Sequence, residues 1–176
     1  MRLALKSCTV RSWAAGDVAS LVRHANNRRI WINLRDRFPY PYEKRDAQAF
    51  IKRMSTTQPE TMFAIEVDGA AVGGIGFVVH EDVERVSAEV GYWLGEEFWG
   101  RGITTEALVA LGQYAIARHG LTRLYALPFA YNTASSRVLE KAGYVLEARL
   151  RRSAVKDGQI IDQLQYAYIV PAEKSG

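Results

Sequence analysis

The stretch from residue 89 to residue 107 constrains the fold more than any other part of this chain. In residues 89–94 the apolar side chains alternate between two faces, which is typical of a strand. Gly100 and Gly102 follow in a short turn, and residues 103–119 have the apolar spacing of a helix. A glycine turn before a helix N-terminus presents free backbone amides to an anion, and Arg101 adds a positive charge. The turn matches neither GxGxxG nor GxxxxGK[ST], so it indicates neither a dinucleotide fold nor a P-loop.

The remaining elements are predicted by periodicity and by turn residues. Strands are predicted over residues 3–11, 61–67, 71–79, 87–94, 123–129, 144–152 and 159–170, and helices after Asp17 and over 43–54, 103–118 and 133–142. Asn132 is a typical helix N-cap, and Asp157-Gly158 is a typical hairpin turn. The sequence therefore predicts an α+β fold with a mixed, mostly antiparallel sheet of seven strands and about four helices. We expect one domain over residues 1–171 and a short tail over residues 172–176.

Composition limits the compartment and the kind of ligand. The net charge of +4 and the pI of about 9.3 suit an anionic ligand, although solubility alone explains them equally well. The single cysteine, Cys8, excludes an internal disulfide, and the three histidines lack metal-ligand spacing. No apolar run approaches the ~20 residues that span a bilayer, and residues 1–6 are too polar for a secretory signal. We expect a cytoplasmic protein that binds no metal and no membrane.

The residues of the glycine turn resemble one family. Residues 99–104, Trp-Gly-Arg-Gly-Ile-Thr, resemble the acyl-CoA pyrophosphate loop of the GNAT N-acetyltransferases, Gln/Arg-x-x-Gly-x-Gly/Ala. Gly102 matches that motif, whereas Trp99 and Thr104 depart from it. Gly-Tyr-Trp-Leu before the turn and Thr-Glu-Ala after it are similar to the RimJ/RimL branch, the ribosomal-protein N-terminal acetyltransferases, in which an aromatic residue at the Trp99 position is common.

The predicted order of elements is also that of the GNAT family, and the resemblance covers nearly the whole chain. It implies an α/β/α-layered fold whose sheet splays between the strand ending at Leu94 and the strand starting at Arg123. It also implies that acetyl-CoA is the co-substrate, with its pantetheine arm in the splay. The second cofactor motif, Asn-x-x-Ala/Ser, matches Asn132 and Ser135, although helix capping alone also explains this pair. The cofactor-binding residues that the resemblance implies are Trp93, Leu94, Trp99, Gly100, Arg101, Gly102, Ile103, Thr104, Thr105, Asn132 and Arg137.

Two residues are predicted to act in catalysis. The resemblance implies that Glu89 removes a proton from the amine, usually through water, which requires partial burial or a water chain near neutral pH. An ion pair of Glu89 with Arg85 or Arg123 is an equally good interpretation. Ser135 is the predicted hydrogen-bond donor to the leaving sulfur, because Leu139 occupies the position where many family members carry a tyrosine.

Residues 26–42 mix cations, aromatics and prolines, and the resemblance implies that they form a wall of the acceptor site. The substrate residues predicted there are Trp31, Arg35, Phe38 and Tyr40, although each aromatic residue is also a good candidate for core packing. The arginines of this segment favour an acidic or neutral acceptor over a polycation.

The resemblance predicts acetyl transfer to a primary amine by direct attack in a ternary complex. A protein N-terminal α-amine is the first candidate, and a polyamine, an amino sugar or an aminoglycoside is the second. A non-catalytic acyl-CoA-binding regulator is the alternative of another class. We expect no direct nucleic-acid contact, and relatives suggest a homodimer.

Overall fold

A computed structural model of the chain describes residues 1–171, and the predicted tail over 172–176 lies outside the described residues. The described residues build one eight-stranded sheet in the order β1-β2-β3-β4-β5-β6-β8-β7. The strands are β1 (Arg2–Ala4), β2 (Thr9–Arg11), β3 (Met62–Val67), β4 (Ala70–Val79), β5 (Ser87–Leu94), β6 (Arg123–Ala126), β7 (Val145–Lys156) and β8 (Gln159–Ile169). The α-helices are α1 (Val18–Ala25), α2 (Arg28–Trp31), α3 (Lys44–Thr56), α4 (Ile103–His119) and α5 (Thr133–Lys141).

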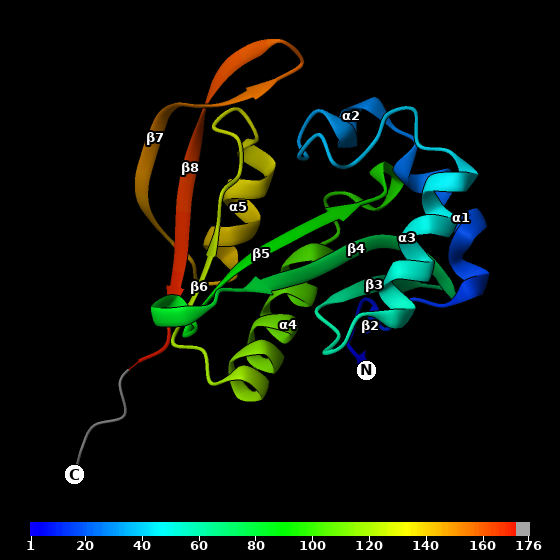
Figure 1. Cartoon of the computed structure of the whole chain (residues 1–176), viewed down its shortest axis with the longest axis horizontal. Coiled ribbons are helices and arrows are strands. Elements are labelled where there is room, and N and C mark those ends of the chain that lie inside the picture. The colour runs from blue at the N-terminus through cyan, green and yellow to red at the C-terminus, as the bar shows by residue number, and fades with distance from the viewer. Residues whose placement is uncertain (172–176) are drawn as a thin grey trace.

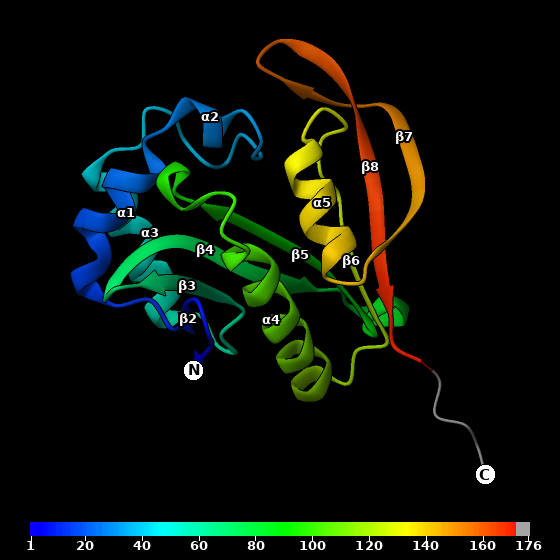
Figure 2. The same cartoon turned by 180° about the vertical axis from the view of Figure 1, so that it is seen from behind.

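Helices cover both faces of the sheet. Figure 1 shows α1 and α3 in front of strands β2 to β4, and Figure 2 shows α4 and α5 on the opposite face. The larger core lies on the α4 and α5 side, where Leu108, Leu111 and Leu139 are fully buried. A smaller core under α1 and α3 contains Leu21 and Ile51. The α/β/α layering that the resemblance implied is confirmed.

Strand β5 lies between two different neighbours. On one side it pairs antiparallel with β4 from Ala88 to Leu94. On the other side it pairs parallel with β6 at three positions only, ending at Glu89 opposite Tyr125. Beyond Glu89 the two strands diverge, as Figure 1 shows, and the edge of β5 that faces β6 has no strand partner. The predicted splay between these strands is confirmed.

The sheet has eight strands, so the predicted count of seven is wrong. Residues 3–11 were predicted as one strand, but the chain reverses where the Leu5 amide donates to the Cys8 carbonyl over 2.9 Å, and β1 pairs with β2. The carboxylate of Glu106, in the first turn of α4, accepts the amides of Lys6 and Ser7 over 2.7 and 3.0 Å. Helix α2 is an additional single turn within residues 26–42, where no helix was listed among the predicted elements. These features depend on contacts between distant residues, which periodicity does not record.

Helix caps and turns follow the predictions more closely. The side chain of Asn132 accepts the Ser135 amide over 3.1 Å and begins α5. Asp157 and Gly158 form the turn of the β7–β8 hairpin, both with positive φ. Asp17 precedes α1 as predicted, but its carboxylate accepts the Ala14 amide and pairs with Arg11 instead of capping the helix. No helix within residues 1–171 is long and apolar enough to cross a membrane.

Candidate active site

The turn before α4 forms a cradle of backbone amides, comprising residues 100–105. Gly100 and Gly102 have φ of 76° and 77°, a conformation that favours glycine, and Gly102 is the N-cap of the helix. Within the described residues, no acceptor contacts the amides of residues 100–105, and the next amide, that of Glu106, donates to the Gly102 carbonyl over 3.1 Å. A Cβ at either glycine would meet open space. Free amides at a helix N-terminus, open to solvent, fit the phosphates of an acyl-CoA.

The side chains of the cradle have other partners. Arg101 donates to the Glu97 carbonyl over 2.7 Å and lies over the Phe98 ring. Trp99 donates its indole proton to the Leu94 carbonyl over 2.8 Å and is 41% exposed. Ile103 is buried in the core, so it offers only its backbone to a ligand. The groups of the cradle that are available to a ligand are therefore mainly backbone amides, because these side chains already have partners within the chain.

The unpaired edge of β5 leads to this cradle, through the 3-10 turn η3 (Glu96–Phe98). Leu94 packs into the larger core, and Trp93 packs on the opposite face against Phe38, with ring centroids 5.7 Å apart. Both side chains are thus occupied in packing. The Gly95 amide donates to the Val72 carbonyl over 2.7 Å, so in the antiparallel β4–β5 ladder the backbone groups of Trp93 face Gly74 on β4, and those of Leu94 face the splay. Of these two residues, only Leu94 therefore presents a backbone amide to a ligand in the splay.

Helix α5 carries predicted residues at the splay, and one of them, Ser135, contacts a residue of β5 that was not predicted. The hydroxyl oxygen of Ser135 lies 2.8 Å from the phenol oxygen of Tyr92 on β5. Burial raises the pKa of Tyr92, and the hydrogen bond with Ser135 opposes that shift without cancelling it. Asn132 caps the helix, while Arg137 is exposed. Tyr92 and Ser135 therefore link β5 to α5 beside the edge that the cofactor arm is predicted to meet.

Glu89 lies on the other face of β5, among charged and aromatic residues. Its carboxylate pairs with Arg35 and is partly buried, with 29% of the side chain exposed. Tyr125 is its neighbour across the β5–β6 pair, and the charge of Glu89 adds to burial in raising the Tyr125 pKa. The Tyr125 hydroxyl is 2.7 Å from His80 Nε2. The prediction that Glu89 pairs with Arg85 or Arg123 is wrong. Arg85 donates to the Asp82 carbonyl, and Arg123 pairs with Glu147.

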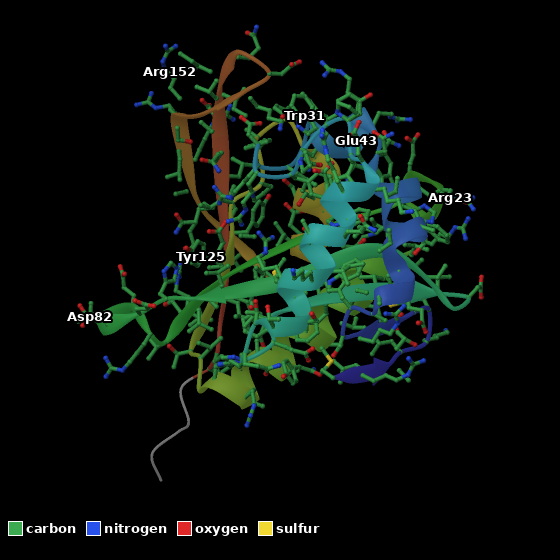
Figure 3. All side chains as sticks on the ribbon, turned by 45° about the vertical axis from the view of Figure 1, so that its right-hand side comes forward. Arg23, Trp31, Glu43, Asp82, Tyr125 and Arg152 are labelled. Carbon is green, nitrogen blue, oxygen red and sulfur yellow. The ribbon has the colours of Figure 1, made fainter. Side chains whose placement is uncertain are left out.

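The predicted acceptor residues divide between packing and exposure. Phe38 packs on Tyr42 and Trp93, whereas Tyr40 is 44% exposed beside Trp31. Trp31 is covered by Lys156, whose Nζ lies 3.7 Å from the ring centroid. Figure 3 shows Trp31 beside the β7–β8 hairpin, on which Arg152 is labelled. The segment from residue 28 to residue 42 and the hairpin tip therefore face each other above the sheet.

Ion pairs within the chain neutralise most of the arginines of this segment. Arg28 pairs with Asp157, Arg29 with Glu96, and Arg35 with Glu89. This weakens the expectation of an acidic acceptor that rested on their charge. Within residues 1–171, no group of three or more His, Cys, Asp or Glu side chains is placed to hold a metal.

Comparison with known proteins identifies the family. The model of the GNAT acetyltransferase domain matches residues 8–145, which include β5, the cradle and Asn132. The chain belongs to the GNAT acetyltransferase family. The predicted resemblance is therefore confirmed, and acetyl transfer from acetyl-CoA is the chemistry of that family.

Individual GNAT proteins are similar over shorter ranges. The uncharacterized N-acetyltransferase YoaA of Bacillus subtilis (strain 168) is 33% identical over 102 residues, which cover 58% of this chain and 57% of that protein. The ribosomal-protein-serine acetyltransferase of Escherichia coli (strain K12) is 30% identical over 112 residues, which cover 64% of this chain and 62% of that protein. The match thus spans less than two thirds of the length of either relative.

A solved GNAT structure shares the fold over its whole length. RimL, the ribosomal L7/L12 alpha-N-protein acetyltransferase in complex with coenzyme A, has a TM-score of 0.85 and 22% identity. The alignment covers 97% of this chain and 98% of RimL. At this identity the likeness shows the fold alone.

Two residues of this GNAT chain near the candidate site, and one contact between side chains, were not predicted. Tyr92 lies within the family motif, and the alternation of β5 already put it on the face opposite Glu89, so that signal was present. Lys156 precedes the hairpin turn in a stretch of charged residues, where nothing in the sequence marks it as buried. The contact between His80 and Tyr125 joins residues 45 positions apart, and no local pattern indicates it.

Proposed function

We propose that this chain transfers the acetyl group of acetyl-CoA to a primary amine in a ternary complex, and that the acceptor is the α-amine of a protein N-terminus. One observation carries the proposal: the amides of residues 100–105 have no acceptor in the described part of the chain, and they adjoin the unpaired edge of β5. Together these features fit a ligand with phosphates at one end and an extended amide-bearing arm at the other.

The cradle and the β5 edge hold the co-substrate in this proposal. The amides of residues 100–105 donate to the pyrophosphate, and the helix dipole of α4 strengthens their attraction for the negative charge. Backbone groups on the unpaired edge of β5, the Leu94 amide among them, bond the pantetheine arm as a neighbouring strand would. They also donate to the oxygen that becomes negative in the transition state. Acetyl-CoA supplies the acetyl group and a thiolate leaving group.

Glu89 receives the proton of the attacking amine in this proposal. An ammonium group has no lone pair, so the acceptor must lose a proton before its nitrogen attacks. Partial burial and the adjacent Arg35 fix the position of the Glu89 carboxylate on the face of β5 that the acceptor wall covers. Ser135, on the opposite face, donates a hydrogen bond to the leaving sulfur, while Asn132 and Arg137 contact the cofactor.

The choice of acceptor rests on the relatives. The similar E. coli protein is named for acetylation of a ribosomal protein, and RimL for α-N acetylation of L7/L12. These names support a protein N-terminus as the acceptor class. Because the arginines of residues 28–35 are paired internally, charge contributes little to the choice.

The proposal is tested by the release of free thiol from acetyl-CoA. Peptides with a free α-amine are assayed beside the same peptides with a blocked N-terminus, and beside polyamines and amino sugars. We expect turnover with free α-amines only. Turnover with a polyamine or an amino sugar alone would replace the proposed acceptor. Tight CoA binding with no turnover on any amine would show a non-catalytic acyl-CoA-binding protein instead.

A further inference from the structure

In the proposed function, the leaving sulfur needs a hydrogen-bond donor, and Ser135 is that donor. How the Ser135 hydroxyl is oriented is inferred below, and the inference rests on the proposed function. Ser135 lies in the first turn of α5. Leu139, one turn later on the same helix, is fully buried in the larger core and has no donor. The hydroxyl of Ser135 rotates freely unless a partner fixes its proton. What contacts that hydroxyl therefore decides where its proton points.

Tyr92 is the side chain that contacts it. The phenol oxygen lies 2.8 Å from Ser135 Oγ and 3.3 Å from the Ser135 carbonyl oxygen. A phenol is a stronger acid than an aliphatic alcohol, so the tyrosine is the better donor of the pair. Each hydroxyl is able to donate across the 2.8 Å contact, and the greater acidity of the phenol favours donation from Tyr92 to Ser135 Oγ, the closer of its two acceptors. With that lone pair occupied, the serine hydroxyl directs its own proton elsewhere.

The surroundings keep Tyr92 in its donor form. Burial raises the pKa of its hydroxyl above the ordinary value of 10. The phenol therefore stays neutral and protonated throughout the pH range in which acetyltransferases are assayed. Tyr92 does not transfer its proton; it accepts no charge during the reaction and only holds the serine.

We propose that Tyr92 is a positioning residue, whose phenol donates to Ser135 Oγ and thereby directs the Ser135 hydroxyl proton toward the sulfur of acetyl-CoA. In the reaction, Glu89 first passes the ammonium proton to solvent. The neutral amine nitrogen then bonds to the carbonyl carbon, and the proton that it loses as the amide forms passes to Glu89. The carbon–sulfur bond breaks with its electron pair on sulfur. The sulfur leaves as a thiolate that accepts the Ser135 hydrogen bond, so no proton leaves either hydroxyl group.

The first test is a double-mutant cycle on turnover. We expect Tyr92→Phe to lower kcat about tenfold with the acetyl-CoA KM unchanged, because one oriented hydrogen bond is lost. Ser135→Ala lowers kcat by at least as much, and adding Tyr92→Phe to it lowers kcat no further. Tyr144→Phe is the matched control, because Tyr144 is a second buried tyrosine in this core whose hydroxyl has no partner among the described residues. If Tyr92→Phe lowered kcat by the same factor in wild type and in Ser135→Ala, the role of Tyr92 would be only to hold β5 and α5 together. That result would overturn the proposal.

The second test does not depend on turnover, so it separates this proposal from the proposed function. The thiol of bound CoA is titrated by its ultraviolet thiolate absorbance, as a difference against the same protein with desulfo-CoA, which lacks the sulfur. A directed hydrogen bond stabilises the thiolate, so we expect its pKa to rise by about one unit in Tyr92→Phe and in Ser135→Ala, and to stay unchanged in Tyr144→Phe. An unchanged thiol pKa in Tyr92→Phe overturns the positioning role, even if wild-type protein acetylates no amine tested. A raised thiol pKa in Tyr92→Phe supports the positioning role, whether or not wild-type protein acetylates an amine.

Discussion

At the scale of single residues, Arg35 connects the predicted acceptor wall to the predicted catalytic base. It was predicted as part of the acceptor wall, and it pairs with Glu89, the predicted base on β5. The pair lies partly exposed on the sheet face opposite Tyr92 and Ser135. The proposed base and the proposed sulfur donor therefore approach β5 from opposite faces, so the amine and the leaving sulfur interact with different side chains.

Replacing Glu89 by Gln tests its role as the base. We expect Glu89→Gln to lower kcat about 100-fold with the acetyl-CoA KM unchanged, because general-base catalysis typically contributes that much. Steady-state rates of thiol release measure it. Glu147→Gln is the matched control, because Glu147 also pairs with an arginine on the sheet but lies outside the proposed site. Equal rates for wild type and Glu89→Gln would leave Glu89 as the carboxylate of a structural ion pair.

Replacing Gly102 by Glu tests the cradle. The backbone at Gly102 has φ of 77°, so any side chain strains it by about 1 kcal/mol, and the carboxylate also repels phosphate. We expect CoA affinity to fall by at least about 100-fold, measured by titration calorimetry. Gly69→Glu controls for strain, because Gly69 has φ of 80°, an equally open Cβ position and a place in the distant β3–β4 turn. Retained CoA affinity in Gly102→Glu would remove residues 100–105 from the phosphate site.

These residues also show what could be predicted from sequence. Gly102 and Asn132 act through their own neighbours in the chain, so their residue types indicate their conformations. Glu89 is partly buried near the splay, as its proposed role requires, but its ion-pair partner was not predicted, because Arg35 lies 54 positions away. The same limit hid the contact of Tyr92 with Ser135, which depends on how β5 and α5 pack.

At the scale of elements, the tip of the β7–β8 hairpin is fastened to the segment around α2. Lys156 is 2% exposed, and its Nζ lies 2.8 Å from Asp36 and over the Trp31 ring. The Tyr131 hydroxyl, just before α5, donates to the Ile32 carbonyl. Three elements that are far apart in sequence thus meet at the predicted acceptor wall. A lysine this buried against an aromatic ring contributes both packing and cation–π attraction.

Removing the Lys156 side chain tests whether this contact shapes the acceptor site. We expect Lys156→Ala to raise the KM of the peptide acceptor about tenfold and to leave the acetyl-CoA KM unchanged, because Trp31 loses the group that holds it. Steady-state kinetics with each substrate varied in turn measure both constants. Asp157→Asn is the control: it removes the exposed pair with Arg28 at the same tip and keeps a residue type that tolerates positive φ. An unchanged acceptor KM in Lys156→Ala would place the acceptor elsewhere.

At the scale of the whole molecule, Arg11 ties the edge of the sheet to the first helix. It pairs with Asp17 before α1 and with Glu66 on β3, and all three side chains are less than 15% exposed. The hydrogen bond from Arg11 holds the Glu66 pKa below its ordinary value of 4.5. Burial alone would raise the Asp17 pKa, but hydrogen bonds from Arg11 and the Ala14 amide outweigh it and lower the pKa.

Lowered carboxylate pKa values set the direction of a pH effect. The stabilisation is complete above the ordinary values of 3.8 and 4.5 and is lost as the pH falls through the lowered folded-state values. We expect Arg11→Met to reduce the free energy of unfolding by about 3 kcal/mol at neutral pH, because it leaves two carboxylates with little solvent exposure unpaired. Its further loss on acidification to about pH 3 should be smaller than that of wild type. Urea unfolding at both pH values measures this.

Arg2→Met is the control for that prediction, since Arg2 also contacts Glu66 but is 62% exposed. It should change stability by less than about 1 kcal/mol. If Arg11→Met and Arg2→Met were equally stable at neutral pH, the buried network would contribute no more than a surface ion pair.

At this scale too, the predicted parts of the fold depend on neighbouring residues in the sequence, and the unpredicted parts depend on distant ones. The hairpins and the main helix were indicated by alternation, by Asp157-Gly158 and by the glycines around α4. The separation of β1 from β2 was not, because Glu106 fixes the turn at Lys6 and Ser7 from about 100 residues away. In this chain, the central hairpins and the main helix could thus be predicted from local sequence, whereas the β1–β2 edge of the sheet depends on a contact with a distant residue.

The unpaired edge of β5 has a consequence for aggregation. An exposed strand edge is a template on which a second chain adds a strand, and sheet proteins usually protect theirs at the outer strands. Here the free edge lies inside the sheet, between β5 and the diverging β6, with α5 behind it. It is only the few residues from Val90 to Leu94 long, and a strand from another chain would have to enter past β6 and the β7–β8 hairpin. The fold thus keeps hydrogen-bonding groups available to a slender ligand, while the position of this edge opposes the addition of a strand from another chain.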